Sequence, residues 1–298
     1  MVRGLLRTMR PQQWVKNLFV LAPVVYYELP RAHATGHVDV DKILGALLGF
    51  ACFSLLASAV YVLNDVVDVE ADRAHPVKCN RPIAAGVVSL PAARVAMVAL
   101  ALAAFAAGGL LGGLFVATLA GYVANNVAYS FGVKRIAYVD VLSIALGFEL
   151  RVLAGSFAAD VPPSTYLLIV TFVLAAFLGL GKRMHELVQQ EKVGSSKTRK
   201  VLERYDKRVV HVLLLATGTA TVVTYVVYTL DPSTRAQFGT DYMVVSALFM
   251  LAGVLRFVML VRTHPEVESP TEQMLRDVPF VATGVLGAIS LVLIVFFT

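Results

Sequence analysis

Charged residues are scarce in this sequence. Asp, Glu, Lys and Arg make up only 15% of the 298 residues, whereas 58% are hydrophobic and the mean hydropathy is +0.73. A soluble domain carries about 25% charged residues, so this composition argues against one. Several uncharged stretches reach the ~20 residues that cross a bilayer as a helix, and they lack the alternation that a membrane β-barrel needs. The predicted fold class is therefore all-α, a polytopic membrane protein.

Cysteine is also scarce, with two residues in the chain. Cys52 lies inside an apolar run and Cys79 in a polar stretch, so we expect both thiols to be free and exclude a disulfide framework. A cleavable signal peptide is not expected either. The basic N-terminus leads into further apolar segments rather than to a cleavage site of small residues.

Apolar segments predict nine membrane spans in a single transmembrane domain over residues 1–298. The segment 95–133 is uncharged and too long for one span, and its two glycine pairs predict a tight turn between two spans. The other predicted spans are 14–29, 43–63, 139–159, 164–181, 209–230, 242–261 and 278–298.

Lys and Arg are distributed unequally between the predicted loops. With the N-terminus in the cytoplasm, twenty fall on the cytoplasmic side, three on the opposite side and three within or beside spans. The positive-inside rule therefore predicts a multi-pass plasma-membrane protein with its charged motifs on the cytoplasmic side. The net charge of +6 reflects this topology, and we expect no nucleic-acid partner.

The acidic stretch that begins at Asn64 follows directly on an uncharged apolar run. If the helix continues through it, Asp65, Asp68 and Asp72 lie at positions i, i+3 and i+7 and share one face. Carboxylates that face one way repel one another unless a cation lies between them, and hard oxygen ligands of this kind suit Mg²⁺. We therefore predict the three aspartates as metal ligands and catalytic residues, with Asn64 orienting the substrate.

Basic residues follow these acids in the chain. Arg73, Lys78 and Arg81 supply charged donors that suit phosphate oxygens, so acids and bases together predict a site for a Mg²⁺-bridged diphosphate. The alternative is a solvated helix end in which acids and bases merely pair. The position of the acids at the end of an uncharged span favours the site.

The pattern N-D-x-x-D-x-x-x-D, followed by H-P-x-K-x-x-R-P-I-A-x-G, resembles the first signature of the UbiA-type intramembrane prenyltransferase superfamily. The residues that carry it are Asn64, Asp65, Asp68, Asp72, His75, Pro76, Lys78, Arg81, Pro82, Ile83, Ala84 and Gly86. The resemblance implies nine transmembrane helices around a central cavity open to the cytoplasm, with Mg²⁺ as the cofactor. It agrees with the number of spans predicted above.

A second candidate region joins the fourth and fifth predicted spans. Tyr129 is followed by Lys134, Arg135 and then Asp140. Members of the family carry a Tyr and then Lys or Lys-Arg in this loop, in contact with the diphosphate. The resemblance therefore implies substrate binding here, whereas the alternative is anchoring of the loop at the membrane surface.

Glu149 and Arg151 lie deep inside the fifth predicted span. Charges at that depth must face a cavity or a partner, and residues two positions apart on a helix do not face each other. An ion pair with another helix and a role in substrate binding both stay open.

The family usually carries a second aspartate-rich motif after the sixth span, and this chain has Lys182, Arg183 and Glu186 there instead. A second acidic cluster suits a second metal ion, whereas a Lys-Arg pair suits direct contact with an anion. The substitution predicts two anionic substrates rather than one diphosphate and a neutral ring. His185 stands at no metal-ligand spacing with another His or Cys.

This second motif, the loop after Asp68 and the opening segment from Arg10 to Asn17 resemble the actinobacterial decaprenyl-phosphate phosphoribosyltransferases. The resemblance covers essentially the whole chain. It implies transfer of 5-phosphoribose from phosphoribosyl diphosphate to a polyprenyl (decaprenyl) phosphate, releasing diphosphate, for the synthesis of cell-wall arabinan precursors. Assembly into a homo-oligomer is left open. The predicted substrate-binding residues are Asn64, Lys78, Arg81, Tyr129, Lys134, Arg135, Asp140, Lys182, Arg183 and Glu186.

Two alternatives are carried alongside this hypothesis. A prenyltransferase would move a polyprenyl group from its diphosphate to an aromatic acceptor, and the missing second acidic motif argues against it. A transporter or cation channel would need polar residues along a path open to both sides, whereas the charges here gather at one side of the predicted spans.

Overall fold

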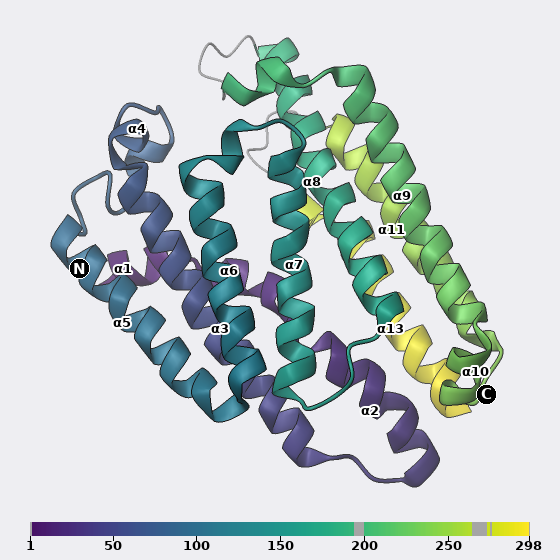
Figure 1. The fold of residues 1–298 in the computed structure, drawn as a ribbon. Helices are drawn as coiled ribbons and strands as arrows, with labels where there is room; N and C mark the ends of the chain where they lie inside the picture. Colours follow the sequence, from purple (N-terminus) through teal and green to yellow (C-terminus); the bar gives the residue numbers. More distant parts are fainter. Residues whose placement is uncertain (1, 194–199, 264–272, 275, 298) are drawn as a thin grey trace. The chain divides into compact units, whose positions relative to one another are not determined.

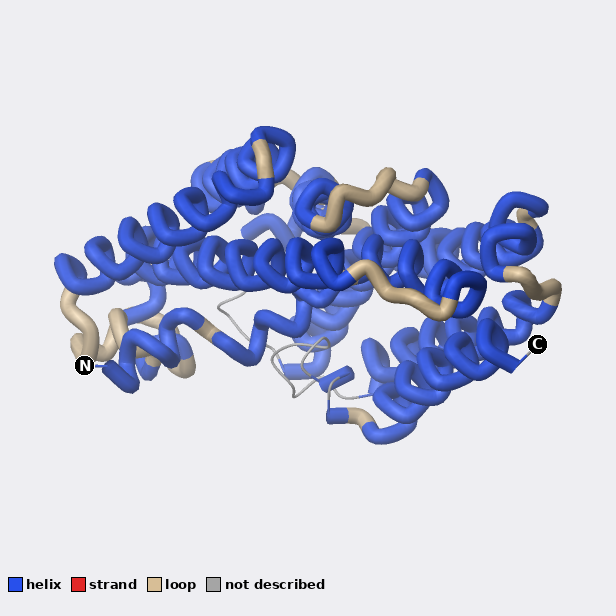
Figure 2. Tube along the Cα trace, turned by 90° about the horizontal axis from the view of Figure 1, so that it is seen from below, coloured by secondary structure: helices blue, strands red, loops and turns tan. Residues whose placement is uncertain are grey.

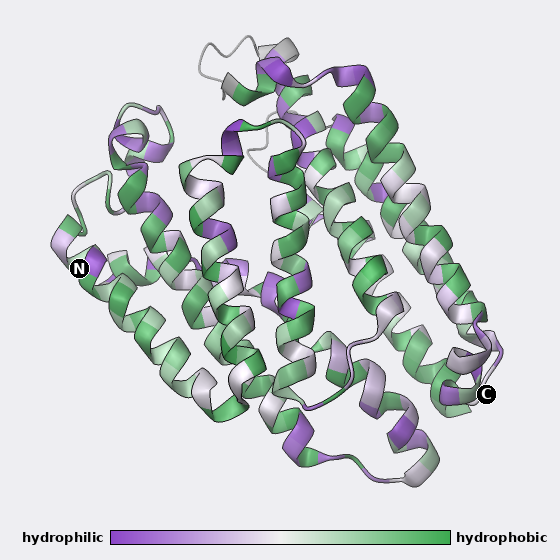
Figure 3. Ribbon diagram, in the orientation of Figure 1, coloured by the Kyte–Doolittle hydropathy of each residue, from purple (hydrophilic) through white to green (hydrophobic). Residues whose placement is uncertain are grey.

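In the computed structural model, residues 2–193, 200–263, 273, 274 and 276–297 are described, and every regular element among them is a helix (Figures 1 and 2). Seven of the described helical stretches are long and apolar enough to cross a membrane, by length and composition. Apolar residues dominate the long helices, while α7 also carries hydrophilic residues part-way along its length (Figure 3). The seven stretches are Val40–Val67, Leu90–Leu111, Val139–Ala158, Thr165–Gln190, Lys207–Leu230, Tyr242–Arg262 and Val278–Phe297.

The chain forms two compact units. Unit 1 comprises residues 1–25, 39–133 and 147–163, and unit 2 comprises residues 26–38, 134–146 and 164–298. The division falls inside two α-helices, α2 (Ala22–Thr35) and α7 (Val139–Ala158), and inside the 3-10 helix η4 (Val133–Arg135).

Unit 1 is organised around α3, which begins after Asp39. The Asp39 side chain caps the helix by accepting from the amide of Lys42 at 3.3 Å. The chain turns between α5 and α6 at Gly112, whose φ of 96° suits glycine, so the predicted glycine turn is confirmed. The elements of the unit are α1 (Val2–Met9), η1 (Pro11–Val20), α3 (Val40–Val67), α4 (Val69–Arg73), η2 (Lys78–Asn80), α5 (Leu90–Gly108), η3 (Gly109–Leu111), α6 (Gly113–Phe131) and the second half of α7.

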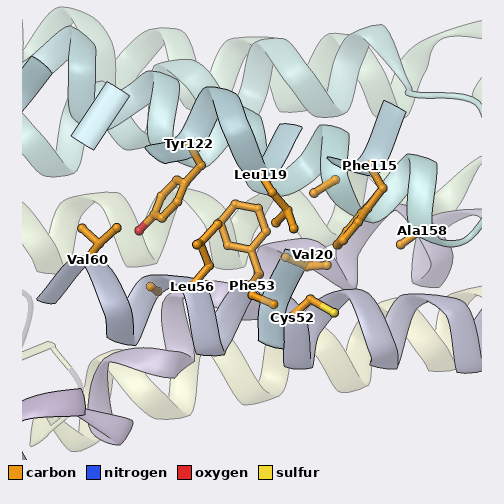
Figure 4. Close-up of a cluster of buried hydrophobic side chains, with 12 residues drawn as sticks. Val20, Cys52, Phe53, Leu56, Val60, Phe115, Leu119, Tyr122 and Ala158 are labelled. Carbon is orange, nitrogen blue, oxygen red and sulfur yellow. The ribbon is translucent and has the colours of Figure 1, made fainter. Parts of the chain in front are cut away.

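The core of unit 1 joins α3, α5, α6, α7 and the end of η1. Phe53, Phe115 and Leu119 are fully buried there, and Figure 4 shows them meeting across the facing helices. Lipid tails are as apolar as these side chains, so close packing rather than exclusion of water holds such helices together. Gly155 illustrates that closeness, because a Cβ at this position would lie 2.0 Å from the Val20 carbonyl oxygen.

Unit 2 is built from helices whose ends are capped by aspartates. Asp206 accepts from the amides of Arg208 at 2.7 Å and Val209 at 3.1 Å, which begins α9. Asp231 caps α10 in the same way through Ser233. The helices that lie wholly in the unit are α8 (Thr165–Val193), η5 (Lys200–Arg204), α9 (Lys207–Leu230), α10 (Pro232–Phe238), η6 (Tyr242–Ser246), α11 (Ala247–Thr263) and α13 (Val278–Phe297); η4 (Val133–Arg135) leads into it.

Two of the predicted spans differ most from the structure. The segment 14–29 is divided at Leu21 between η1 and α2. Pro23 suits the first turn of a new helix, and the Asn17 side chain in η1 donates a hydrogen bond to Ser54 of α3. The sixth predicted span does not end at Gly181, because the residues that follow it are good helix formers and α8 continues to Val193. The prediction of nine spans stays a prediction.

Candidate active site

Two buried aspartates converge on one guanidinium in unit 1. Arg81 Nη1 lies 2.8 Å from Asp72 Oδ2 and 3.3 Å from Asp65 Oδ1. Arg10 Nη2 lies 2.6 Å from the same oxygen of Asp65. The two carboxylates are 3% and 5% exposed, whereas the side chains of Arg10 and Arg81 are 25% and 29% exposed. Both cations therefore keep donors within reach of a ligand, since a guanidinium carries five N–H groups.

The junction of α3 and α4 brings these acids to one side. α3 ends at Val67 and α4 begins at Val69, at the C-terminal end of α3 (Figure 1). Asp68 between them keeps a nearly helical path, because its amide donates to Asn64 O at 2.9 Å and its carbonyl accepts from Asp72 N at 2.8 Å. Asp65 and Asp72 thus lie two helical turns apart and face the same way. Asp68 itself is half-buried.

A short loop presents Arg81 to the acids. His75 Nδ1 accepts from the amides of Val77 at 3.2 Å and Lys78 at 3.3 Å, which folds the chain back after α4. Beyond Arg81, the buried side chain of Ile83 packs with apolar residues of α3, α4 and α5. The loop is therefore fixed on both sides of the arginine, and Lys78 stands half-buried at the start of η2.

Asn64 faces α6 rather than the two arginines. Its Oδ1 accepts a hydrogen bond from the hydroxyl of Ser130, which also contacts the Asn126 carbonyl at 2.8 Å. Tyr129, the neighbour of Ser130, is half-buried in the same unit. The last turn of α6 is therefore tied to the residue that precedes Asp65.

Arg10 is the functional candidate that sequence reasoning missed. It lies 55 positions from Asp65 in the chain. In the sequence it was noted only as the start of the opening segment that resembles the family, and not as a site residue. Its backbone is left-handed, with φ 52° and ψ 60°, which is uncommon for a residue with a side chain. Pro11 disfavours the right-handed helical conformation at the residue before it, and the ion pair with Asp65 accompanies this unusual geometry.

A second charged cluster lies in unit 2. Arg183 is fully buried in α8, with Nε 3.0 Å from Asp140 Oδ2 and Nη1 bonded to Glu186. The Tyr205 hydroxyl donates to Asp140 Oδ1 and accepts from the amide of Tyr138 at 2.9 Å. Burial, followed by the hydrogen bond to Asp140, raises the pKa of Tyr205 well above its ordinary value. These groups therefore contact one another inside the protein.

The remaining predicted site residues also belong to unit 2. Lys182 and Lys134 are half-buried, and Arg135 is exposed. His185 is fully buried, with Nδ1 3.4 Å from the Val261 carbonyl oxygen. The structure thus gathers Asp140, Arg183 and Glu186 in one cluster.

Comparison with known proteins places this arrangement in a family. Residues 31–275 match the UbiA prenyltransferase family. The chain belongs to this family. It is 39% identical to the decaprenyl-phosphate phosphoribosyltransferase of Mycolicibacterium smegmatis over 76% of this chain and 70% of that protein. The enzyme of the same name from Corynebacterium glutamicum is 34% identical over 92% of this chain and 81% of that protein. The resemblance inferred from residues 64–86 is confirmed.

Solved structures show the same fold. A UbiA homologue from Archaeoglobus fulgidus bound to GPP and Mg²⁺ matches with a TM-score of 0.62 at 17% identity, over 95% of this chain and 100% of that chain. A UbiA homologue from Aeropyrum pernix K1, solved in its apo form, matches with a TM-score of 0.67 at 17% identity, over 94% and 99% of the two chains.

The acids of this UbiA family protein fit a divalent cation through their chemistry. Among the described residues, no three Asp, Glu, His or Cys side chains stand close enough together to hold a metal ion. Asp65 and Asp72, however, already share one positive group, Arg81 Nη1. Mg²⁺ takes one or two carboxylates and completes its shell with waters and substrate phosphates. This carboxylate pair is therefore a suitable donor set for Mg²⁺ brought with a diphosphate.

Proposed function

We propose that this UbiA family protein is a Mg²⁺-dependent decaprenyl-phosphate phosphoribosyltransferase. It transfers 5-phosphoribose from phosphoribosyl diphosphate to a polyprenyl phosphate and releases diphosphate, a step toward cell-wall arabinan. The observation that carries the proposal is the pairing of Asp65 and Asp72 with Arg10 and Arg81, in a chain whose curated relatives at 34–39% identity bear this name. Those names favour it over transfer of a prenyl group to an aromatic acceptor.

The reaction is a substitution at the anomeric carbon of ribose. A phosphate oxygen of the lipid forms the new bond to that carbon while the bond to the diphosphate oxygen breaks. Asp65 and Asp72, with Asp68 between them in the chain, would hold Mg²⁺, which when bound neutralises charge on the leaving diphosphate. Arg10 and Arg81 bind phosphate oxygens through their free N–H groups. The protein thus acts by positioning and charge stabilisation.

The nucleophile needs little help from a base. The second pKa of a phosphomonoester is about 6, so the lipid phosphate is largely ionised at neutral pH. We assign its binding, and that of the remaining phosphate oxygens, to Lys78, Tyr129, Lys134, Arg135 and Lys182.

Asp140, Arg183 and Glu186 stay predicted as substrate ligands. Their mutual contacts favour a structural role, in which the buried ion pair between Asp140 and Arg183 fixes the start of α7 against α8. Direct contact with ribose hydroxyls would then fall to Glu186, the least buried of the three, whose side chain is 18% exposed.

We also propose the membrane arrangement that the family implies. The chain forms one domain of nine spans around a cavity open to the cytoplasm, in the plasma membrane. Two observations support it: twenty Lys and Arg lie on the predicted cytoplasmic side against three on the other, and UbiA folds match over 94–95% of this chain.

The test is direct transfer of label. Purified protein in nanodiscs receives phosphoribosyl diphosphate labelled in the ribose, decaprenyl phosphate and Mg²⁺. Label should enter the butanol-extractable lipid, and it should not do so in the Asp65→Asn variant. Absence of labelled lipid from the unmodified protein contradicts the proposal. Prenylation of an aromatic acceptor from decaprenyl diphosphate would support the prenyltransferase instead, and ion flux into liposomes without turnover would support a channel.

A further inference from the structure

Polar contacts attach the N-terminal segment 10–17 to α3 at intervals along its length. Three α3 positions receive them, 54, 58 and 65, whose separations of four and seven residues place them on one helical face. The segment runs antiparallel to α3, because its earlier residues meet later residues of the helix. The three contacts are Arg10 to Asp65 at 2.6 Å, Trp14 Nε1 to Ser58 Oγ at 3.0 Å and Asn17 Nδ2 to Ser54 Oγ at 3.0 Å.

Arg151 of α7 holds the far end of this segment. Its Nε donates to Asn17 Oδ1 at 2.9 Å, so Asn17 is bonded on both sides of its amide. Its Nη2 donates to the Tyr122 hydroxyl at 3.0 Å and its Nη1 to the Gly147 carbonyl at 2.7 Å. One guanidinium from α7 thus links α6 to the N-terminal segment.

Arg151 is a buried cation held by neutral groups. It is 5% exposed, and its guanidinium carbon lies 4.8–5.3 Å from the ring centroids of Phe53, Tyr122 and Phe148. Among the residues that the structure describes, its hydrogen bonds go to an amide, a phenol and a carbonyl. A charge inside a membrane protein is costly and marks a functional position, although cation–π contacts offset part of the cost.

We propose that Arg151 is a positioning residue for Arg10, acting through Asn17 and the segment between them; this inference rests on the phosphoribosyltransferase function proposed above. The segment has one end at the candidate diphosphate site and the other on Arg151. With Asn17 fixed, the strained backbone at Arg10 is held where its guanidinium meets Asp65. Without Arg151, the segment loosens and Arg10 no longer stays at the site.

Tyr61 of α3 lies beside Arg10, whose guanidinium carbon is 5.2 Å from the centre of the Tyr61 ring. The packed rings around Arg151 also leave it a poor direct ligand for a phosphate. An effect of Arg151 on the donor must therefore pass through its neighbours.

The first test is kinetic. Arg151→Met removes the donors while keeping a long side chain. We expect the KM for phosphoribosyl diphosphate to rise about tenfold, the effect of losing one charge-assisted hydrogen bond, with kcat and the KM for the lipid changed less than about twofold. In an Arg10→Ala background, the same substitution should leave the donor KM unchanged. Equal effects in both backgrounds overturn the proposal.

The second test needs no turnover. Trp14 is the single tryptophan of the chain, so its fluorescence reports on this segment alone. Arg151→Met and Asn17→Ala should each increase quenching of Trp14 by acrylamide. The control Leu119→Ala opens the same core at a fully buried residue and should lower the melting temperature without changing the quenching or the donor KM.

The two tests separate the two proposals. A protein that forms no labelled lipid refutes the proposed function, while Trp14 quenching still decides whether Arg151 fixes the segment. Unchanged quenching in Arg151→Met, or an equal change in Leu119→Ala, refutes the positioning role.

Discussion

Arg10 and Asp65 form an ion pair at 2.6 Å across 55 positions of sequence. The pair joins the chain's opening segment to the end of α3, where the acidic motif begins. Asp65 is also shared with Arg81, so one buried carboxylate has two cations around it. Both cations are thereby held beside one carboxylate, where they can meet a common anion.

Replacing Asp65 tests that arrangement. Asp65→Asn should lower the rate of phosphoribosyl transfer by at least about 10²-fold, the scale found when one preorganised electrostatic group is removed. The assay is labelled ribose phosphate in extracted lipid. Glu70→Gln is the matched control, because Glu70 is 81% exposed and pairs only at the surface with Arg73, a kind of contact that contributes about 0–1 kcal/mol. Loss of activity in the control as well would argue against a specific role for Asp65.

Arg10 should contribute mainly to donor binding. Arg10→Ala is expected to raise the KM for phosphoribosyl diphosphate by at least tenfold, because a charge-assisted contact is lost. Arg10→Lys should recover only part of it, since an ammonium cannot contact Asp65 and a phosphate in the same forked geometry. The exposed Arg7 provides the comparison, and Arg7→Ala should leave the KM unchanged. Full recovery by lysine would reduce the role of Arg10 to charge alone.

The buried cluster of unit 2 should matter more for stability than for donor affinity. Arg183→Met leaves Asp140 without its cation, and breaking a buried pair in this way costs about 3–5 kcal/mol. The melting temperature in detergent should fall clearly. Tyr205→Phe removes one hydrogen bond to Asp140 and should cost less, about 1–3 kcal/mol.

Lys182→Gln, at a half-buried position, should instead raise the KM for the lipid phosphate without lowering the melting temperature. The reverse pattern would make Arg183 a direct ligand.

The sequence was sufficient for features that depend on local spacing. Asp65 and Asp72 lie seven residues apart, and the helical period alone predicts that they face the same way. The glycine turn at Gly112 and the apolar helices follow from the same kind of local rule. Family membership could be read from residues 64–86 because that motif is long and its residue types are specific.

Features that depend on distant contacts could not be read in this way. No local pattern shows that Arg10 reaches Asp65, or that Arg151 bonds to Asn17 across 134 positions. Lys182 and Arg183 were both predicted from the sequence as substrate ligands, yet Arg183 is fully buried and Lys182 is half-buried. One step along a helix turns a side chain by about 100°, and only tertiary contacts, such as that of Arg183 with Asp140, decide which of the two is enclosed.

Metal dependence is the remaining prediction. Removal of divalent ions with EDTA should abolish phosphoribosyl transfer, and excess Mg²⁺ should restore it, because the leaving diphosphate needs its charge neutralised. Asp72→Asn should raise the Mg²⁺ concentration for half-maximal rate, since one of the two carboxylates that share Arg81 is then neutral and a weaker ligand. The measurement is the transfer rate across a Mg²⁺ titration for both proteins, with Glu70→Gln as the control that should follow the unmodified curve. Equal Mg²⁺ requirements in Asp72→Asn and the unmodified protein would remove Asp72 from the metal site and leave it as the partner that holds Arg81 in place.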